Sequence, residues 1–366
     1  MADLDLEALS EKAFARCLCI ERKRAERSQK PFLLILVNAG ELLRDAVGGE
    51  DALWEKILQA VRSSVRETDI SGWHQERLAF GAIFTEIPPA NFPAAVSAIC
   101  AKVNAALLNQ LYLHQVNKLR VTFHVFPETP QDGDAWAKPV DLKLYPDLLE
   151  SDTSKKPALA LKRMIDVVAS MALLALASPM MAAIAAAIKL TSRGPVLFRQ
   201  QRLGRFGHPF TFLKFRSMFV NNDPAIHQDY IKQFISGTAS QNPANGAGVY
   251  KLTQDPRVTR VGRLLRKTSL DELPQLLNVL VGQMSLVGPR PPLPYECAAY
   301  ATWHRRRLLE AKPGITGLWQ VSGRSKTKFD EMVRLDLMYA KSWSLGLDLK
   351  ILLKTPRAVF SGAGAY

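Results

Sequence analysis

The stretch of this sequence best suited to chemistry is RKTSLDELPQLLNVLVGQMSLVGPRPP, residues 266–292. Two neighbouring carboxylates, Asp271 and Glu272, lie between Arg266 and Arg290, the latter in the proline-rich turn GPRPP. One carboxylate can attack phosphorus, a second can hold Mg²⁺, and guanidinium groups can clamp phosphate oxygens. The pattern therefore indicates phosphoryl-transfer chemistry.

The same residues also fit a purely structural role at the start of a helix. Ser269 followed by Glu272 has the spacing of a capping box, and Pro274 is tolerated in a first helical turn. Judged by the local pattern alone, capping is the favoured interpretation. The surrounding arginines shift the interpretation towards phosphoryl transfer, and the dipole of such a helix would hold Asp271 ionised.

Positive charge is concentrated in one part of the chain. Of the net charge of +14, about ten charges fall between Lys155 and Met218, where eleven Lys or Arg residues are opposed only by Asp166. Such a strip suits nucleic acid, phosphorylated substrates or an anionic membrane surface. Because the strip surrounds an apolar segment, we expect a membrane and not a nucleic acid as the partner. The strip includes Lys214 and Arg216, two candidates for binding a phosphorylated substrate.

The apolar segment within the strip is Val167–Ile188, which has 22 residues and no charge. As a helix it would be about 33 Å long, enough for a hydrocarbon core of about 30 Å. Ser178 and Pro179 lie at its middle, where proline kinks or breaks a helix. The Ser178 hydroxyl can bond a backbone carbonyl that the proline leaves free.

Basic residues flank the apolar segment at both ends: Lys162, Arg163, Lys189 and Arg193. Positive flanks favour the cytoplasmic side, so both ends are expected there. The favoured interpretation is a re-entrant helix over about residues 164–190 that enters and leaves on one face. A kinked transmembrane span and a buried soluble helix are the alternatives.

The first part of the chain, residues 1–128, reads as a soluble α/β domain. Strand and helix patterns follow one another in the order β-α-β-β-α-β, which suggests a ferredoxin-like sandwich. Residues 129–158 are rich in Pro, Asp and Lys and are expected to form a linker. Residues 159–366 then form the second domain, a re-entrant membrane helix followed by a compact mixed α/β domain.

This first domain faintly resembles the nucleotidyl cyclase fold of diguanylate cyclases. The likeness lies in ERKRAERSQKPFLLILV and in VRETDISG before a hairpin. Those cyclases carry a Gly-Gly-Asp/Glu-Glu-Phe hairpin and a metal-binding Asp on the first strand. Here the hairpin region reads GWHQERLAF, and Asn38 stands near the position of the Asp. Because an amide and a missing acidic pair cannot hold two divalent ions, we expect a catalytically dead domain that regulates or forms a homodimer.

The second domain is similar to the bacterial sugar transferase family, the monotopic phosphoglycosyl transferases. The likeness runs from about Leu161 to the end of the chain. It is carried by LKRMIDVVAS, the broken LALASPMM, GPVLFRQQRLGR, FLKFRSM, TSLDELPQLLNVLVGQMSLVGPRP, KPGITGLWQVSGR and DLMYAKSWSLGLDLKILLKT. The resemblance implies that Asp271 is the nucleophile and that Glu272 binds Mg²⁺. It also implies that the substrate-binding candidates are Lys214, Arg216, Arg266, Arg290 and Arg324.

The reaction that this resemblance implies is the transfer of a sugar-1-phosphate from a UDP-sugar to polyprenyl (undecaprenyl) phosphate. It would run through an aspartyl-phosphosugar intermediate and release UMP. The implied location is the cytoplasmic face of the inner membrane, at the first membrane step of exopolysaccharide or O-antigen assembly. Glucose, galactose and N-acetylated donors all fit the motifs, and we expect a hexose-1-phosphate. A non-catalytic membrane-docked sensor and a nucleic-acid binder are the two alternatives.

Overall fold

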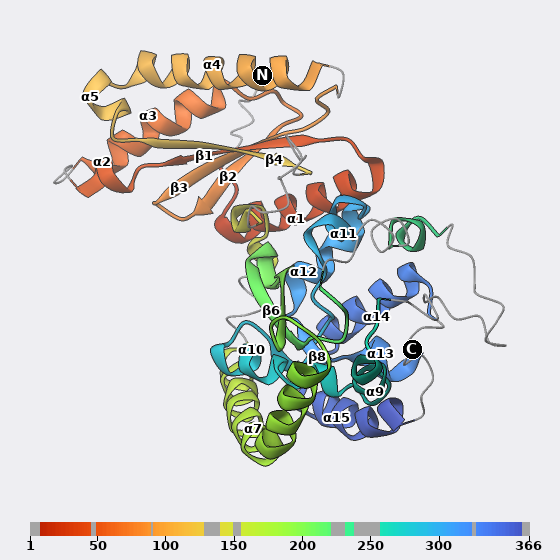
Figure 1. The fold of residues 1–366 in the computed structure, drawn as a ribbon. Coiled ribbons are helices and arrows are strands. Elements are labelled where there is room, and N and C mark those ends of the chain that lie inside the picture. Colours follow the sequence, from red (N-terminus) through yellow and green to blue (C-terminus); the bar gives the residue numbers. More distant parts are fainter. Residues whose placement is uncertain are drawn as a thin grey trace. The chain divides into compact units, whose positions relative to one another are not determined.

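A computed structural model describes residues 8–44, 49–88, 91–127, 140–148, 155–220, 231–237, 257–323 and 327–360. The chain divides into two compact units, residues 1–131 with 141–152 and residues 132–140 with 153–366. Each unit mixes helices with strands, as expected from the sequence, and each is described separately below (Figure 1).

The first unit is built on a four-stranded antiparallel sheet. Its strands are β1 (Phe32–Asn38), β2 (Ile70–Gln75), β3 (Ala79–Phe84) and β4 (Arg120–Phe126), in the order β2-β3-β1-β4. The central strand β1 pairs Leu33 with Phe84 of β3 and with Val125 of β4. Because helices separate β1 from β2 and β3 from β4, the element order is the β-α-β-β-α-β order expected from the sequence.

Helices cover this sheet with apolar side chains. On α3 (Glu50–Arg62) and α4 (Phe92–Gln110), residues such as Ile57, Val103 and Leu107 are fully buried in a core with β1 and β3. On α1 (Glu11–Ser28), Phe14 lies so close to Gly72 and Gly81 that a side chain at either glycine would collide with its ring. The close approach of α1 to the sheet therefore requires glycine at both positions.

Part of the segment expected to be a linker belongs to the first unit. Residues 141–148 include a short 3₁₀ turn, Leu142–Leu144, and Leu144 is fully buried. Arg22 of α1 donates to the Leu144 carbonyl at 2.9 Å and makes a bidentate ion pair with Asp147 at 2.8 Å. The linker prediction is therefore wrong for residues 141–148. The Pro- and Asp-rich composition of the segment indicated a linker, and composition does not reveal that a few of its apolar and acidic residues dock on α1.

The second unit combines one long helix, two small sheets and several short helices. An antiparallel hairpin joins β5 (Leu197–Leu203) to β6 (Pro209–Phe215), and β7 (Ser285–Val287) pairs in parallel with β8 (Gly314–Thr316). Helices within its described residues include α7 (Lys156–Thr191), α9 (Arg260–Thr268), α10 (Gln275–Val281), α11 (Pro294–Ala298), α12 (Arg306–Glu310), α13 (Leu318–Ser322), α14 (Phe329–Lys341) and α15 (Leu345–Phe360).

The long helix α7 contains the predicted break point, Ser178 and Pro179, but remains one continuous helix. Its first, yellow-green half and its second, green half run in different directions in Figure 1. The Ser178 hydroxyl donates to the Ala175 carbonyl at 2.8 Å. Ala175 lies four residues before Pro179, so this is the carbonyl that the proline leaves without its usual donor. The expected contact is therefore present.

Both halves of α7 return to the same part of the second unit. Leu174 of the first half packs in a cluster with α10 and β7, and Ile188 of the second half packs with Phe215 and Leu265. Leu273 contacts both clusters. Between these anchored ends the helix exposes large apolar side chains, with Leu176 82% exposed.

Two helices among the described residues are long and apolar enough to cross a membrane, α4 and α7. The inward face of α4 contributes Val103 and Leu107 to the core of the first unit. On α7, by contrast, Val168, Met171, Leu176 and Met180 all leave apolar surface exposed. Of these two helices, α7 is therefore the one that leaves a large apolar surface without protein packing along its middle.

Candidate active site

The two neighbouring carboxylates lie in a short turn that precedes α10. Asp271 and Glu272 belong to a 3₁₀ turn, Leu270–Glu272, and Ser269 before it adopts the left-handed conformation with φ of 57°. Ser269 makes no side-chain cap, and its carbonyl accepts a bond from the backbone N–H of Glu272. The capping-box interpretation is therefore wrong, since the side chain of Glu272 is used elsewhere.

Lys214 of β6 connects this turn to the hairpin. Its Nζ lies 2.8 Å from Glu272 Oε1 and 3.8 Å from Asp271 Oδ2. Because side chains alternate along a strand, residues 210, 212 and 214 share one face of β6. Phe210 and Phe212 are buried on that face, and the Phe212 ring lies 5.6 Å from the Lys214 ammonium. The hairpin thus presents one ammonium group to both carboxylates.

The two carboxylates differ in their electrostatics. Burial raises the pKa of Asp271; Lys214 opposes that shift and the charge of Glu272 adds to it. Burial would also raise the pKa of Glu272, but Lys214 and Arg290 outweigh it and lower that pKa. The pair does not begin a helix as expected, because it lies in a separate turn before α10.

Two predicted arginines surround the pair. Arg266, in the last turn of α9, donates through Nε to Ser217 Oγ at 2.9 Å, and its charge lowers the pKa of Asp271. Arg290 Nη2 lies 3.8 Å from Glu296 Oε1, and its side chain is 38% exposed. The structure therefore brings Arg266, Arg290 and Lys214 together around the carboxylates.

Arg202 of β5 is a further charged residue of this cluster that the sequence analysis did not select. It donates through Nη1 to the Pro291 carbonyl at 2.7 Å, and its guanidinium lies 4.3 Å from the centre of the Phe212 ring. Burial and the nearby Arg290 lower the pKa of Arg202 to about 10. Its position on the strand paired with that of Lys214 was the available signal, but Arg199 on the same strand shares it.

The remaining predicted residues lie differently. Arg216 is buried and donates through Nη2 to the carbonyl and hydroxyl of Ser192, at 2.8 and 2.7 Å, so it braces the chain where α7 ends. A side chain at Gly194 would collide with this guanidinium. Arg324 falls outside the described residues.

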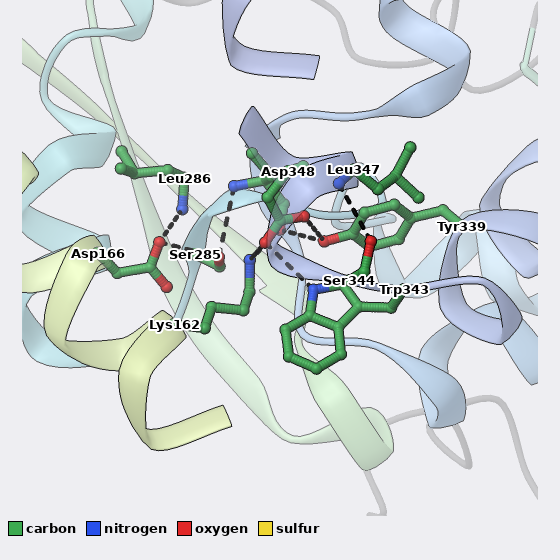
Figure 2. Close-up of polar contacts among 10 residues, drawn as sticks. Lys162, Asp166, Ser285, Leu286, Tyr339, Trp343, Ser344, Leu347 and Asp348 are labelled. Carbon is green, nitrogen blue, oxygen red and sulfur yellow. Dashed lines mark hydrogen bonds and ion pairs between the residues drawn. The ribbon is translucent and has the colours of Figure 1, made fainter. Parts of the chain in front are cut away.

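A buried polar network ties the start of α7 to the rest of the unit (Figure 2). Lys162 Nζ pairs with Asp348 Oδ2 of α15 at 2.5 Å and donates to the Val287 carbonyl of β7 at 3.2 Å. Asp348 also accepts from the Tyr339 hydroxyl at 2.7 Å and from Trp343 Nε1 at 3.1 Å. The network joins α7, β7, α14 and α15 at one point.

One helical turn further on, Asp166 binds the same strand. Its Oδ1 accepts from Ser285 Oγ at 3.1 Å and from the Leu286 backbone N–H at 3.0 Å (Figure 2). Arg163 donates to the carbonyls of Val279 and Leu280, each at 2.6 Å, at the end of α10. The basic flank that the sequence analysis assigned to membrane topology is therefore also a structural anchor.

The carboxylate pair offers hard oxygen donors of the kind that Mg²⁺ prefers. Among the described residues no group of three or more His, Cys, Asp or Glu side chains could hold a metal. Mg²⁺ commonly binds through only one or two carboxylates together with substrate phosphates and waters. Asp271 and Glu272 fit that mode of binding, and they do not form a site enclosed by protein ligands alone.

The family of this chain follows from comparison with known proteins. A family model described as bacterial sugar transferase matches residues 157–362. The chain belongs to this family. The match contains α7 from its second residue on, the carboxylate pair and the basic residues described around that pair, so the likeness expected from the sequence motifs is confirmed.

Individual relatives agree with this assignment. The undecaprenyl-phosphate galactose phosphotransferase of Salmonella typhimurium is 44% identical over 219 residues, which are 60% of this chain and 44% of that protein. The exopolysaccharide production protein ExoY of Sinorhizobium fredii is 42% identical over 209 residues, 56% of this chain and 88% of that protein. The chain thus spans less than half of the first relative and most of the second.

A solved structure resembles a smaller part of the chain. A DGC protein from Thermotoga maritima has 15% sequence identity and a TM-score of 0.27, over 34% of this chain and 87% of that one. A TM-score of this size is too low to assign a shared fold.

Proposed function

We propose that this protein transfers a sugar-1-phosphate from a UDP-sugar to polyprenyl phosphate. The observation that carries the proposal is the placement of Lys214 between Asp271 and Glu272, with Arg266 and Arg290 beside them, inside the region matched by the family model. A buried acid flanked by cations is suited to attack a diphosphate, since the cations offset the charge of the phosphate oxygens.

In this proposal Asp271 is the nucleophile. Its carboxylate attacks the β-phosphorus of the UDP-sugar, the bond to the bridging oxygen breaks, and UMP leaves with that oxygen. The sugar phosphate is then held as an acyl phosphate on Asp271. Polyprenyl phosphate attacks the same phosphorus, takes the phosphosugar and restores the carboxylate.

The neighbouring residues have distinct roles in both steps. Arg266 and Arg290 bind phosphate oxygens, and Lys214 neutralises the carboxylates so that an anionic substrate can approach them. Glu272, with the substrate phosphates, would hold Mg²⁺, which supplies charge neutralisation when bound. The lowered pKa of Glu272 suits a metal ligand, which binds as the anion.

We also propose that α7 is a re-entrant membrane helix at the cytoplasmic face of the inner membrane. Three observations support this: the different directions of the two halves of α7, a helix that contains Pro179 (Figure 1), the exposed apolar side chains between the ends, and the anchoring of both ends to the same unit. A helix of this shape would hold the site at the depth where the phosphate of a polyprenyl carrier lies. The donor is proposed to be a UDP-hexose of an exopolysaccharide or O-antigen pathway.

The first experiment compares the wild type with Asp271→Asn. Membrane fractions are incubated with a panel of UDP-sugars and Mg²⁺, with and without polyprenyl phosphate, and UMP is measured. We expect Asp271→Asn to release less than about a hundredth of the wild-type UMP in both conditions, because the amide cannot attack phosphorus.

The matched control is Glu331→Gln, which removes an exposed acid on α14 and should leave UMP release unchanged. If the wild type releases no UMP from any UDP-sugar of the panel, the proposed function is contradicted. An active Asp271→Asn variant contradicts only the covalent mechanism.

The first unit is proposed to be catalytically inactive, with a regulatory or dimer-forming role. Asn38, near the position where a cyclase would carry a metal-binding acid, uses its Oδ1 to accept the Gly40 backbone N–H at 2.9 Å. The amide thus closes a local turn. We expect the full-length chain to form no cyclic dinucleotide from GTP with Mg²⁺ or Mn²⁺, measured by chromatography, and any such product would contradict this assignment.

A further inference from the structure

The loop Gly288–Pro292, which carries Arg290, is held through its backbone carbonyls. The carbonyls of the four residues after Gly288 each accept one hydrogen bond, and the donors come from three elements of the second unit, β5, β8 and α12. These bonds are Gly314 N–H to Pro289 at 2.9 Å, Arg307 Nη2 to Arg290 at 3.1 Å, Arg202 Nη1 to Pro291 at 2.7 Å and Leu203 N–H to Pro292 at 3.0 Å.

The loop has little freedom of its own. Three of its five residues are prolines, whose φ angles are fixed by the ring. Gly288 donates its N–H to the Thr316 carbonyl at 2.8 Å, and a side chain there would lie 2.2 Å from the Lys312 carbonyl oxygen. The Arg290 side chain is therefore presented by a backbone that its neighbours fix on every side.

Arg307 is the more deeply buried of the two arginines that donate to this loop. Its side chain is only 2% exposed, and it pairs through Nη2 with Asp336 Oδ2 at 2.7 Å, an acid of α14 that is 1% exposed. Nη1 lies 3.5 Å from the buried Tyr300 hydroxyl. Neither Arg307 nor Asp336 touches the carboxylate pair, so the contact of Arg307 with the active site runs through the Arg290 carbonyl.

A buried ion pair of this kind needs a reason beyond stability. Replacing buried ion pairs by apolar side chains of similar volume is often neutral or stabilising, because desolvation offsets the attraction between the charges. Here the pair directs one guanidinium N–H at the peptide that carries Arg290. That is a directional demand which an apolar pair cannot meet.

We infer that Arg307, oriented by Asp336, is a positioning residue that holds Arg290 against the carboxylate site. The inference rests on the proposed function for its consequence in catalysis. Arg290 would bind phosphate oxygens only from this backbone position, and a displacement of about 1 Å in a positioned group can cost up to about 100-fold in rate.

A double-mutant cycle on UMP release tests the inference in the full-length protein. We expect Arg307→Lys to lower kcat by about 10-fold to 100-fold, because lysine keeps the charge but lacks the rigid guanidinium plane that directs Nη2 at both Asp336 and the Arg290 carbonyl. Once Arg290→Ala has removed the group being positioned, adding Arg307→Lys should lower kcat by less than about twofold. Effects that multiply overturn the inference, because Arg307 would then act independently of Arg290.

Two further variants guard against trivial outcomes. Arg306→Lys changes the adjacent residue of α12, whose ion pair with Glu310 is nearer the surface, and it should leave kcat unchanged. If Arg307→Lys does not fold, Asp336→Asn repeats the cycle, since asparagine keeps the shape of the acid and removes its charge. Multiplying effects in that cycle overturn the inference equally.

Hydrogen–deuterium exchange measures how firmly the loop Gly288–Pro292 is held, and it does so independently of enzyme activity. In the peptide spanning residues 285–294, the amides of Gly288 and Leu293 donate to Thr316 and Glu296. Arg307→Lys should speed exchange there, and Arg306→Lys should not. Unchanged exchange in Arg307→Lys overturns the inference. Faster exchange together with an inactive wild type supports the positioning and rejects the proposed function.

Discussion

At the scale of single residues, Lys214 distinguishes the two carboxylates. It lies a full ångström closer to Glu272 than to Asp271, at 2.8 Å against 3.8 Å. At Glu272 burial is outweighed by the shorter contact with Lys214 and by the nearby Arg290, so the pKa is lowered, whereas burial raises the pKa of Asp271. Two acids that are adjacent in sequence therefore differ in pKa direction, which suits one to bind cations and the other to react.

His304 provides a pH test of the second unit. Its Nδ1 accepts the Ala301 backbone N–H at 3.1 Å, and Nε2 faces Asp330 Oδ1 at 3.0 Å, so the neutral tautomer with hydrogen on Nε2 fits both contacts. Burial lowers the pKa of His304 below 6.5, although Asp330 opposes the shift. The folded state thus binds fewer protons than the unfolded state near that pH, and its stability falls as pH falls through 6.5.

We expect His304→Asn to remove this part of the pH dependence, since an asparagine oxygen can still accept the Ala301 N–H but does not titrate. Denaturant unfolding on either side of the ordinary histidine pKa, at about pH 7.5 and about pH 5.5, measures it. The wild type should lose more stability than the variant on acidification. An equal loss in both proteins would show that His304 does not titrate on unfolding.

Sequence alone predicted the residues that carry the proposed chemistry but not those that hold them. Asp271, Glu272, Arg266 and Arg290 stand close together in one motif, so spacing was sufficient to select them. Arg307 acts on a backbone carbonyl seventeen residues away, and no pattern of side-chain types records such a contact. The capping box was a wrong interpretation because the spacing of Ser269 and Glu272 cannot reveal that Lys214, from a distant strand, takes the carboxylate.

At the scale of elements, the helix α7 and its break follow from the local sequence, but its anchoring depends on packing against distant parts of the chain. Periodicity and composition predicted an apolar helix with a break at Ser178 and Pro179, and the bond from Ser178 to the Ala175 carbonyl lowers the cost of that break. The anchoring of its first half could not be predicted, because Asp348 lies 186 residues after Lys162 in the chain. The basic residues before α7's apolar segment, Lys162 and Arg163, were interpreted only as indicators of membrane topology, not as anchors.

The Lys162–Asp348 pair gives a stability prediction for this anchor. Both side chains are largely buried, at 13% and 9% exposure, so removing one charge leaves the other buried without its partner. We expect Asp348→Asn to lower the free energy of unfolding by about 3 kcal/mol or more, and Lys162→Met with Asp348→Leu to recover part of that loss. Thermal unfolding in detergent measures both. A loss no larger than that of Asp330→Asn, at the more exposed acid facing His304, would contradict the anchoring role.

At the scale of the whole molecule, the family match and the candidate site both fall in the second unit. The match covers residues 157–362, and every residue assigned a role in the proposed reaction lies within it. The order of elements in the first unit was predictable because each strand and helix has a strong local pattern. The docking of residues 141–148 on α1 was not, because it depends on long-range contacts such as those of Arg22 with the Leu144 carbonyl and with Asp147.

The last prediction concerns the topology of the molecule in the membrane. Lys155 and Arg193 stand at opposite ends of α7, and a re-entrant helix places both on the cytoplasmic side. Single cysteines introduced at these two positions in a cysteine-free background should both resist an impermeant thiol reagent in intact cells. Both should react once the membrane is opened.

Replacing Ser178 and Pro179 by Ala and Leu supplies the opposing case. Both replacements favour a continuous helix, since proline costs about 3 kcal/mol in a helix interior, and a straight helix of this length can span the bilayer. Part of that population should expose the cysteine that replaces Lys155 to the outside and lose activity, because its anchored ends can no longer meet in one unit. If the wild-type background already shows position 155 labelled from outside while position 193 is protected, α7 spans the membrane and the re-entrant proposal is wrong.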